Sequence, residues 1–155
     1  ESEVDLFIDY AKNLIDFTNI RTLLRAKKQE KDVEFLKNII VPGGKLREET
    51  YFDLLNRDIS SDTEAFKRLD IYKYIKEGLD DFKEKGTLSN FEREMDNYFI
   101  DLIKDVKYIT YGPEVVFANV LAKEMEIKNL RIILVSKLNG LDGEFIREKL
   151  RDSYV

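Results

Sequence analysis

Histidine, cysteine and tryptophan are absent from this 155-residue sequence, and proline occurs only twice. Without cysteine or histidine the chain cannot form disulfides, Cys/His zinc sites, a thiol nucleophile or a Ser-His-Asp triad. The absence of histidine also removes the common side chain whose unperturbed pKa lies near neutral pH. A general base would therefore have to be a Glu, Asp or Lys with a shifted pKa.

Dense basic clusters and long apolar runs are also missing. The chain has 26 Lys and Arg against 31 Asp and Glu, which gives a net charge of −5. Its densest basic run, at residues 25–28, is followed at once by acidic residues, so we expect no nucleic-acid partner. No apolar run approaches the roughly 20 residues that span a bilayer, so we expect no membrane-spanning segment.

Helical spacing dominates what is present. Between residues 4 and 24 the apolar residues recur mostly every three or four positions, which predicts one long amphipathic helix. The same spacing predicts further helices over residues 32–40, 46–55, 88–106, 113–138 and 142–152, and one or two helices over residues 65–85. No segment shows sustained strand alternation, so the sequence predicts an all-α fold.

An internal repeat aligns the first helix pair with the last at a shift of 110 residues. Asn19-Ile20-Arg21 matches Asn129-Leu130-Arg131, and the match continues without a gap to Phe35-Leu36 and Phe145-Ile146. One register that persists across a loop indicates two copies of a long-helix/short-helix unit. We therefore expect helical modules at residues 1–57 and 88–155, joined by a helical connector at residues 58–87.

Polar side chains interrupt the apolar stripes of both copies. They are Asp16, Asn19 and Arg21 in the first copy and Glu126, Asn129 and Arg131 in the second. Residues three apart share a helix face, so each acid can contact its asparagine, whereas each arginine needs a partner on another helix. We expect a packed helix junction with a hydrogen-bonded ion network, or alternatively a surface that contacts a partner protein.

One acidic pair raises the possibility of metal chemistry. The run Asp80-Asp81-Phe82-Lys83-Glu84 is similar to the aspartate-rich magnesium motif of all-α prenyl-chain enzymes. Such sites need a second acidic cluster, and the neighbouring lysines indicate a solvated helix face instead. We expect no catalytic residue, metal or cofactor, with a magnesium-dependent enzyme at Asp80 and Asp81 or a generic helical adaptor as the alternatives.

A nearly continuous series of motifs near the C-terminus is typical of one protein family. The motifs are Tyr-Gly-Pro-Glu at 111–114, Lys-Glu-Met-Glu-Ile-Lys-Asn-Leu-Arg at 123–131 and Lys-Leu-Asn-Gly at 137–140. Residues 15–26 and Pro-Gly-Gly-Lys-Leu at 42–46 are similar to an earlier repeat of the same family. The chain thus resembles the C subunit of the archaeal and bacterial A/V-type ATP synthase, which is the counterpart of the d subunit in eukaryotic vacuolar ATPases.

The resemblance implies an all-helical funnel of three related modules, of which two are visible here, so the sequence is similar to the C-terminal portion of a longer protein. It also implies a non-catalytic role without a cofactor. Such a protein would couple the central-stalk subunits to the membrane rotor ring, on the cytoplasmic face of the membrane, for ATP-linked transport of protons or sodium. The six repeated polar residues would then stiffen the funnel wall or contact these partners.

Overall fold

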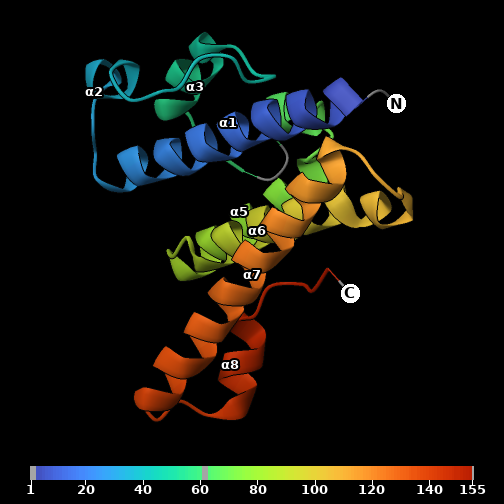
Figure 1. The fold of residues 1–155 in the computed structure, drawn as a ribbon. Coiled ribbons are helices and arrows are strands. Elements are labelled where there is room, and N and C mark those ends of the chain that lie inside the picture. The colour runs from blue at the N-terminus through green and yellow to red at the C-terminus, as the bar shows by residue number, and fades with distance from the viewer. Residues whose placement is uncertain (1–2, 61–62, 155) are drawn as a thin grey trace. The chain divides into compact units, whose positions relative to one another are not determined.

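The computed structural model describes residues 3–60 and 63–154, and no β-strand occurs among them. This confirms the all-α fold class. The chain divides between Phe91 and Glu92 into two compact units, whose helices are labelled in Figure 1. The first unit holds α1 (Glu3–Lys28), α2 (Val33–Lys37), α3 (Glu48–Leu55), α4 (Glu64–Lys67) and α5 (Tyr72–Lys85). The helix α6 (Ser89–Ile103) crosses the division, and the second unit continues with the 3-10 helix η1 (Lys104–Tyr108), α7 (Pro113–Leu138) and α8 (Gly143–Lys149).

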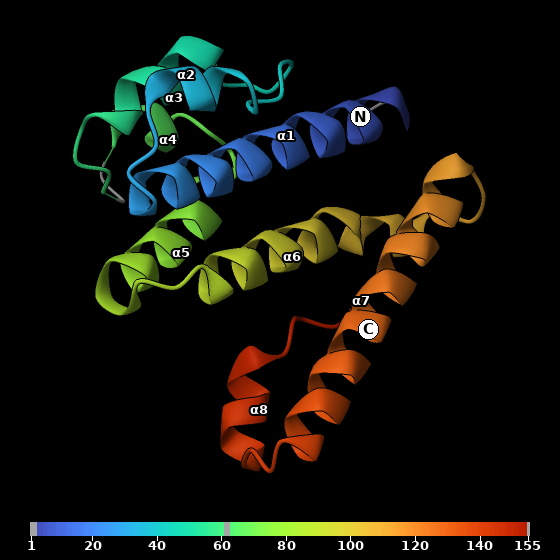
Figure 2. The ribbon, with the colours of Figure 1, turned by 90° about the vertical axis from the view of Figure 1, so that its left-hand side faces the viewer.

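The long helix α1 is the centre of the first unit. It has α2 and α3 on one side and α5 on the other, as Figure 2 shows. Its residues Phe17, Ile20 and Leu23 are fully buried, and burying each such side chain contributes roughly 1.5–3 kcal/mol. The ring of Phe17 packs edge-on against Phe91 at the start of α6, with 6.0 Å between the ring centroids. The apolar stripes read from the sequence are therefore the core of this unit.

A glycine sets the approach of α5 to the first turn of α6. A Cβ added at Gly78 would lie 2.7 Å from the Cα of Phe91. No side chain fits at that distance, so the close helix contact depends on glycine at this position.

In the second unit the short helix α8 runs back alongside the C-terminal half of α7 (Figure 1). Helix α7 begins with Pro113 in its first turn, where a missing N–H costs nothing. It ends at a turn in which Gly140 has a φ of 69°. The buried side of α7 includes Met125 and Ser136, and Ile146 is the buried residue of α8.

The helix boundaries differ from the predicted ones mainly at helix ends. Of the one or two helices predicted at 65–85, the structure has two, α4 and α5, and the helix predicted at 88–106 changes to 3-10 geometry after Ile103. The predicted short helices at 32–40 and 142–152 end earlier, at Lys37 and Lys149. The predicted division into residues 1–57, 58–87 and 88–155 stays a prediction.

Candidate functional site

Asp16 organises a buried junction between α1 and the segment that leads into α3. Its side chain is fully buried. One carboxylate oxygen accepts from the backbone N–H of Lys45 at 2.8 Å, and the other accepts from the N–H of Leu46 at 3.2 Å and the hydroxyl of Tyr51 at 2.7 Å. Burial, and next the negative charge of Asp16, raise the pKa of Tyr51 well above its usual range. The phenol therefore stays protonated and donates to the carboxylate.

The backbone reaches Asp16 because residue 44 is glycine. A Cβ at Gly44 would overlap the Asp16 carboxylate. The Pro-Gly-Gly-Lys-Leu motif read from the sequence thus serves as a backbone clamp on a buried acid. The clamp is a structural arrangement, and it leaves no carboxylate oxygen of Asp16 without a donor.

The side chain of Lys45 extends this junction toward the surface. Its ammonium lies 3.0 Å from Asp9 and 2.8 Å from Asp70. Burial alone would lower the pKa of Lys45, but its hydrogen bonds to Asp70 and Asp9 raise it overall. Burial likewise tends to raise the pKa of Asp70, which the hydrogen bonds from Lys45 and Asn13 lower overall. Both Lys45 and Asp70 are therefore charged at neutral pH.

Asn19 and Asn129 make the same pair of hydrogen bonds in the two copies of the repeat. The amide of Asn19 donates to the carbonyl of Val41 at 2.8 Å and accepts from its N–H at 2.9 Å. The amide of Asn129 donates to the carbonyl of Arg151 at 3.1 Å and accepts from its N–H at 2.9 Å. Each asparagine and its loop residue lie 110 positions from their counterparts. We call this arrangement the asparagine clamp.

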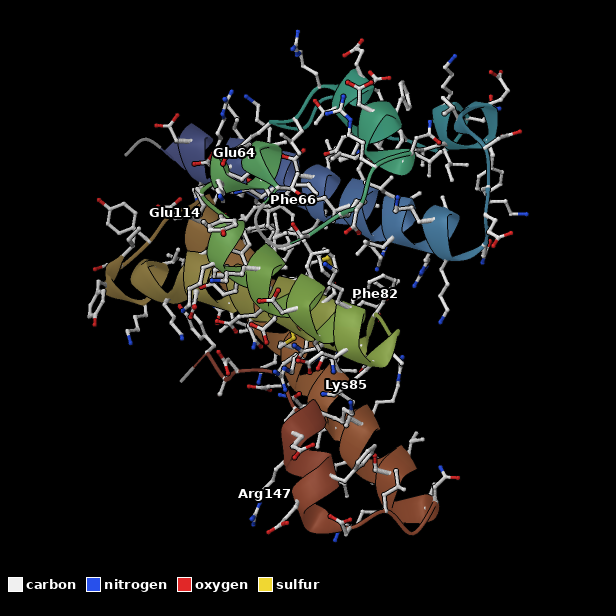
Figure 3. All side chains as sticks on the ribbon, turned by 180° about the vertical axis from the view of Figure 1, so that it is seen from behind. Glu64, Phe66, Phe82, Lys85, Glu114 and Arg147 are labelled. Atoms are coloured by element: carbon white, nitrogen blue, oxygen red, sulfur yellow. The ribbon has the colours of Figure 1, made fainter. Side chains whose placement is uncertain are left out.

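The short helices begin identically in the two copies. Asp32 caps α2 by accepting from the N–H of Phe35, and Asp142 caps α8 by accepting from the N–H of Phe145, both at 2.8 Å. These are N-cap bonds, which satisfy donors that a helix cannot pair internally. Arg147, further along α8, points away from α7 (Figure 3). The repeat found in the sequence therefore also holds at the level of individual hydrogen bonds.

The other predicted site residues are not equivalent in the two copies. Glu126 and Arg131 are exposed on α7, whereas Asp16 is buried and Arg21 is half-buried on α1. Glu126 accepts from Lys123 at 2.7 Å along its own helix. The proposed roles of these four residues in partner contact stay predictions.

A different acid forms the buried polar junction of the second unit. Asp96 on α6 accepts from Lys128 at 2.6 Å and from Arg151 Nε at 2.9 Å. Next to it, the side-chain oxygen of Asn97 accepts from the N–H of Asp152 at 2.9 Å. The sequence analysis missed Asp96 and Asn97. The signal that could have found them is this pair of polar side chains within the apolar stripe of α6, between Met95 and Tyr98.

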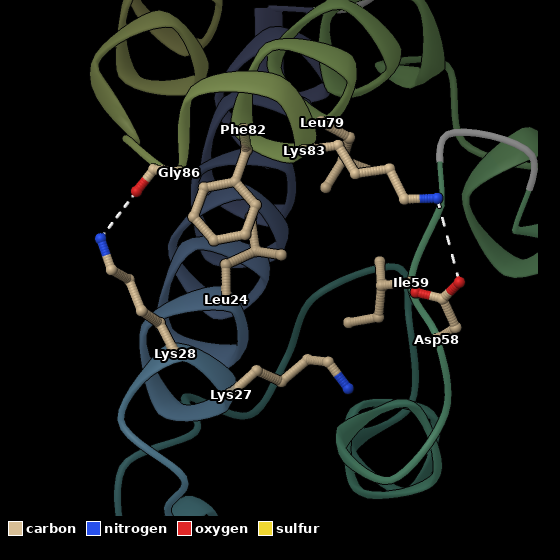
Figure 4. A pocket seen from close by; sticks show the side chains of 9 residues that line it. All are labelled: Leu24, Lys27, Lys28, Asp58, Ile59, Leu79, Phe82, Lys83 and Gly86. Carbon is tan, nitrogen blue, oxygen red and sulfur yellow. Dashed lines mark hydrogen bonds and ion pairs between the residues drawn. The ribbon is translucent and has the colours of Figure 1, made fainter.

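A cavity of about 380 Å³ lies beside the C-terminal end of α1 (Figure 4). Its lining residues are Leu24, Lys27, Lys28, Asp58, Ile59, Leu79, Phe82, Lys83 and Gly86. Lys27 donates to the carbonyls of Leu54, Leu55 and Arg57 at 3.3, 2.6 and 2.6 Å. Burial lowers its pKa, an effect that Asp58 opposes.

The cavity's other lysines are also engaged. Lys28 donates to the carbonyl of Gly86 at 2.7 Å, and Lys83 lies 3.9 Å from Asp58. Lys27 and Lys28 thus cap the C-terminal ends of α3 and α5, where cations are favourable. The lysines here hold helix ends together, and a small anionic ligand would have to compete with those carbonyls.

The acidic pair on α5 does not form a metal cluster. Asp80 is exposed, and Asp81 is paired with Lys85, one turn away, at 2.5 Å. Within residues 3–60 and 63–154, no group of three or more acidic side chains is placed to hold a metal ion. None of the helices in these described residues combines the length and the hydropathy of a membrane-spanning segment.

Exposed apolar side chains follow one side of α7, and we call this strip the outer α7 face. It consists of Val116, Val120, Ile127, Leu130, Leu134 and Leu138. These side chains are 53–87% exposed, although the opposite side of the same helix is also apolar and buried. A helix that is apolar on both sides is typical of one buried on both sides.

Comparisons with known proteins identify a family for most of the chain. A family model described as ATP synthase (C/AC39) subunit matches residues 1–149. The C subunit of the V-type sodium ATPase of Enterococcus hirae is 27% identical over 140 residues, which cover 90% of this chain and 42% of that protein. The C subunit of the A-type ATP synthase of Pyrococcus abyssi is 28% identical over 145 residues, covering 90% of this chain and 38% of that protein.

A third relative matches almost the whole chain. The C subunit of the A-type ATP synthase of Thermococcus onnurineus is 28% identical over 155 residues, covering 99% of this chain and 41% of that protein. The chain thus spans about two fifths of the length of the curated relatives it matches. No solved structure matches it significantly.

Proposed function

This chain belongs to the ATP synthase (C/AC39) subunit family, and from that premise we propose that it couples the central stalk of an A/V-type rotary ATP synthase to the membrane rotor ring. In this role it contributes no catalytic group. It transmits torque that ATP hydrolysis or ion flow generates elsewhere in the complex. The observation that carries the proposal is the family match over residues 1–149.

The buried polar junctions are consistent with such a mechanical role. A part that transmits torque has to keep its shape under load, and fully satisfied polar networks in a low-dielectric interior hold a single arrangement. Asp16 fixes the loop before α3, and the asparagine clamps fix the chain after α2 and after α8. We infer that these contacts resist bending of the two long helices, α1 and α7.

The proposed setting follows from the family. The partners are the central-stalk subunits and the rotor ring, and the location is peripheral, on the cytoplasmic face of the membrane. The transported ion is a proton or sodium. Asp16, Asn19, Arg21, Glu126, Asn129 and Arg131 serve in this proposal as stiffening residues or, where exposed, as partner contacts.

Affinity capture with purified parts of the complex tests the proposal. The tagged chain is immobilised and offered, separately, the central-stalk subunits and the detergent-solubilised rotor ring. We expect both to be retained at physiological salt. The matched control is Phe17→Asp, which places a charge in the core of the first unit and should abolish specific capture together with the helical circular dichroism signal.

Two results would contradict the proposal. If the folded chain retains neither component, it is a helical adaptor of another kind. If the purified chain hydrolyses ATP, or if millimolar magnesium raises its thermal midpoint by several degrees, the non-catalytic assignment is wrong.

A further inference from the structure

The cavity beside the C-terminal end of α1 carries more positive than negative charge on its walls. All the residues that line it belong to the first unit. Three of them are lysines, and Asp58 is the one acidic side chain among them. The volume of about 380 Å³ lies within the range of roughly 300–1,000 Å³ that is typical of small-molecule pockets. The size and the charge of this cavity therefore suit a small anion with some bulk.

The apolar wall of the cavity comes from α1, from α5 and from the segment after α3. Leu24, Ile59 and Leu79 are buried, whereas Phe82 is half-buried and its ring lies beside Leu24 in Figure 4. A ligand that covered the open part of the Phe82 ring would remove apolar surface from water, which is favourable. A compact ion such as phosphate would leave this surface wet, so the wall favours a ligand with an apolar body.

The three lysines differ in how many donors they have left for a ligand. An ammonium group has three N–H donors, and those of Lys27 are used by three carbonyls at the end of α3. Lys28 uses one donor for the carbonyl of Gly86. Lys83 lies 3.9 Å from Asp58, which is too long for a hydrogen bond. Lys83 is therefore able to donate to a ligand, while Lys27 contributes its charge.

Asp58 occupies the place that the anionic group of a ligand would take. Its side chain is 89% exposed, and its contact with Lys83 is drawn at the edge of the cavity in Figure 4. Burial lowers the pKa of Lys27 and Asp58 opposes this effect, so Asp58 acts on both lysines. An exposed ion pair of this kind contributes little to stability. A ligand carboxylate can therefore replace Asp58 at small cost.

We propose that this cavity binds a small amphiphilic carboxylate, whose apolar body covers Phe82 and the buried wall and whose anionic group replaces Asp58 beside Lys83 and Lys27. Both parts of the ligand are needed, because the lysines are matched only by the charge and the wall only by the apolar body. This site goes beyond the proposed coupling role, and it holds or fails independently of binding to the stalk or the ring.

An NMR titration of the complete 155-residue chain with phenylbutyrate tests the proposal. In an isotope-labelled sample at neutral pH, the backbone N–H signals report both where the ligand binds and how tightly. We expect saturable shifts at Leu24, Ile59, Phe82 and Gly86, with a Kd on the order of 0.1–1 mM. Butyrate, which lacks the ring, should bind at least about tenfold more weakly. Phenylbutyramide, which lacks the charge, should bind at least about threefold more weakly.

Two substitutions at the cavity should change the affinity for phenylbutyrate in opposite directions. Lys83→Gln should weaken binding about threefold, because it removes the cation that meets the anionic group. Asp58→Asn should tighten binding about two- to threefold, because it removes the competing carboxylate. Lys76→Gln is the matched control, since Lys76 is exposed on α5 and does not line the cavity. It changes the net charge as Lys83→Gln does and should alter the affinity less than about 1.5-fold.

Three results would overturn the proposal. The first is the absence of saturable shifts at the cavity residues. The second is a set of shifts confined to the outer α7 face, because the ligand would then be binding an exposed apolar surface. The third is equal binding of phenylbutyrate by the unmodified chain, Lys83→Gln and Asp58→Asn, because the charges would then play no part. Lys83 and Asp58 are both exposed, so these variants should fold normally, which their spectra without ligand verify.

Discussion

The buried carboxylate of Asp16 links α1 to the loop before α3 and to α3 itself. Its donors are two backbone N–H groups and the hydroxyl of Tyr51. A charged acceptor is well satisfied by such a set, but the donors become costly if the acceptor is lost. Buried donors without a partner each cost about 1–3 kcal/mol.

We predict that Asp16→Ala destabilises the chain by about 3 kcal/mol or more, since it leaves buried donors unpaired and opens a small void. Urea denaturation followed by circular dichroism measures the effect. Tyr51→Phe removes only one of the donors and should cost about 1–2 kcal/mol. Equal losses for the two variants would show that the backbone donors find other acceptors.

The pair of Lys45 and Asp70 should make a small contribution that depends on pH. The pKa of Asp70 is lowered from 3.8, so its contribution is complete above that value and is lost as the pH falls through the folded-state pKa. The pKa of Lys45 is raised from 10.5, so its contribution is complete below that value and is lost as the pH rises through the folded-state pKa. Stability from this pair is therefore greatest between those limits.

Asp70→Asn should consequently reduce the free energy of unfolding by less than about 1 kcal/mol at neutral pH, because both side chains are partly exposed. The difference from the unmodified chain should shrink below pH 3.8 and above pH 10.5. Urea titrations at constant ionic strength across this range provide the measurement. A difference that is the same at every pH would mean that packing, and not charge, is responsible.

At the level of helices, the contact between α5 and the start of α6 depends on Gly78. Alanine is normally the better helix former by about 1 kcal/mol. Here its Cβ would lie 2.7 Å from the backbone of Phe91, so Gly78→Ala should instead destabilise the chain by about 1–3 kcal/mol through overpacking. Thermal unfolding measures the sign directly.

Gly143 in α8 is the matched control, because a Cβ there would meet no atom within 4 Å. Gly143→Ala should be neutral or slightly stabilising. If both alanine variants stabilise the chain, the helices can move apart, and the close approach at Gly78 is not a constraint.

Most helices could be predicted from the sequence because their apolar spacing is regular and their ends carry Pro or Gly. Whether residues 65–85 form one helix or two could not be decided, because their apolar residues keep helical spacing across the break between α4 and α5. In the structure Leu69 and Ile71 are buried within that break. Tertiary burial of side chains from a turn overrode local periodicity there.

The repeated polar positions were only partly predictable for a similar reason. The asparagine clamps are equivalent in both copies because each binds the backbone of one loop residue, which any side chain can supply. Asp16 and Glu126 differ because the acid needs a close backbone, which Gly44 provides. The residue 110 positions after Gly44 is Tyr154. Aligning the two copies of the repeat shows which side chains hold equivalent positions. It does not show whether the segment that contacts each side chain is equivalent as well.

For the molecule as a whole, a modest net charge accompanies a large exposed apolar strip. The net charge at pH 7 is −5, and the isoelectric point is about 5.0. Charge repulsion therefore vanishes near pH 5, where the outer α7 face can associate. We predict a solubility minimum and increased light scattering near pH 5.0. At about pH 7.5, where the chain carries its net negative charge, solutions should be clear.

A double variant tests whether the apolar strip causes the association. Leu130→Asp with Leu134→Asp should markedly reduce scattering at the isoelectric point of that variant, which has to be determined for it separately. The control is Val135→Asp with Glu124→Gln on the same helix. It leaves the strip intact and should scatter as much light as the unmodified chain. Equal scattering by all proteins would show that charge neutralisation alone is sufficient.

The turns after α1 and α7 show how two copies of a structure can diverge within one molecule. Both turns need a left-handed residue, which is Gly140 in one and Glu30, with a φ of 52°, in the other. The backbone bonds that close them are nonetheless the same, from Lys31 to Ala26 at 2.9 Å and from Leu141 to Ser136 at 3.0 Å. The two copies of the repeat thus keep the same closing backbone hydrogen bond although the residue in the left-handed position differs. Where their side chains have drifted but the backbone has not, the chain itself records which substitutions this architecture tolerates.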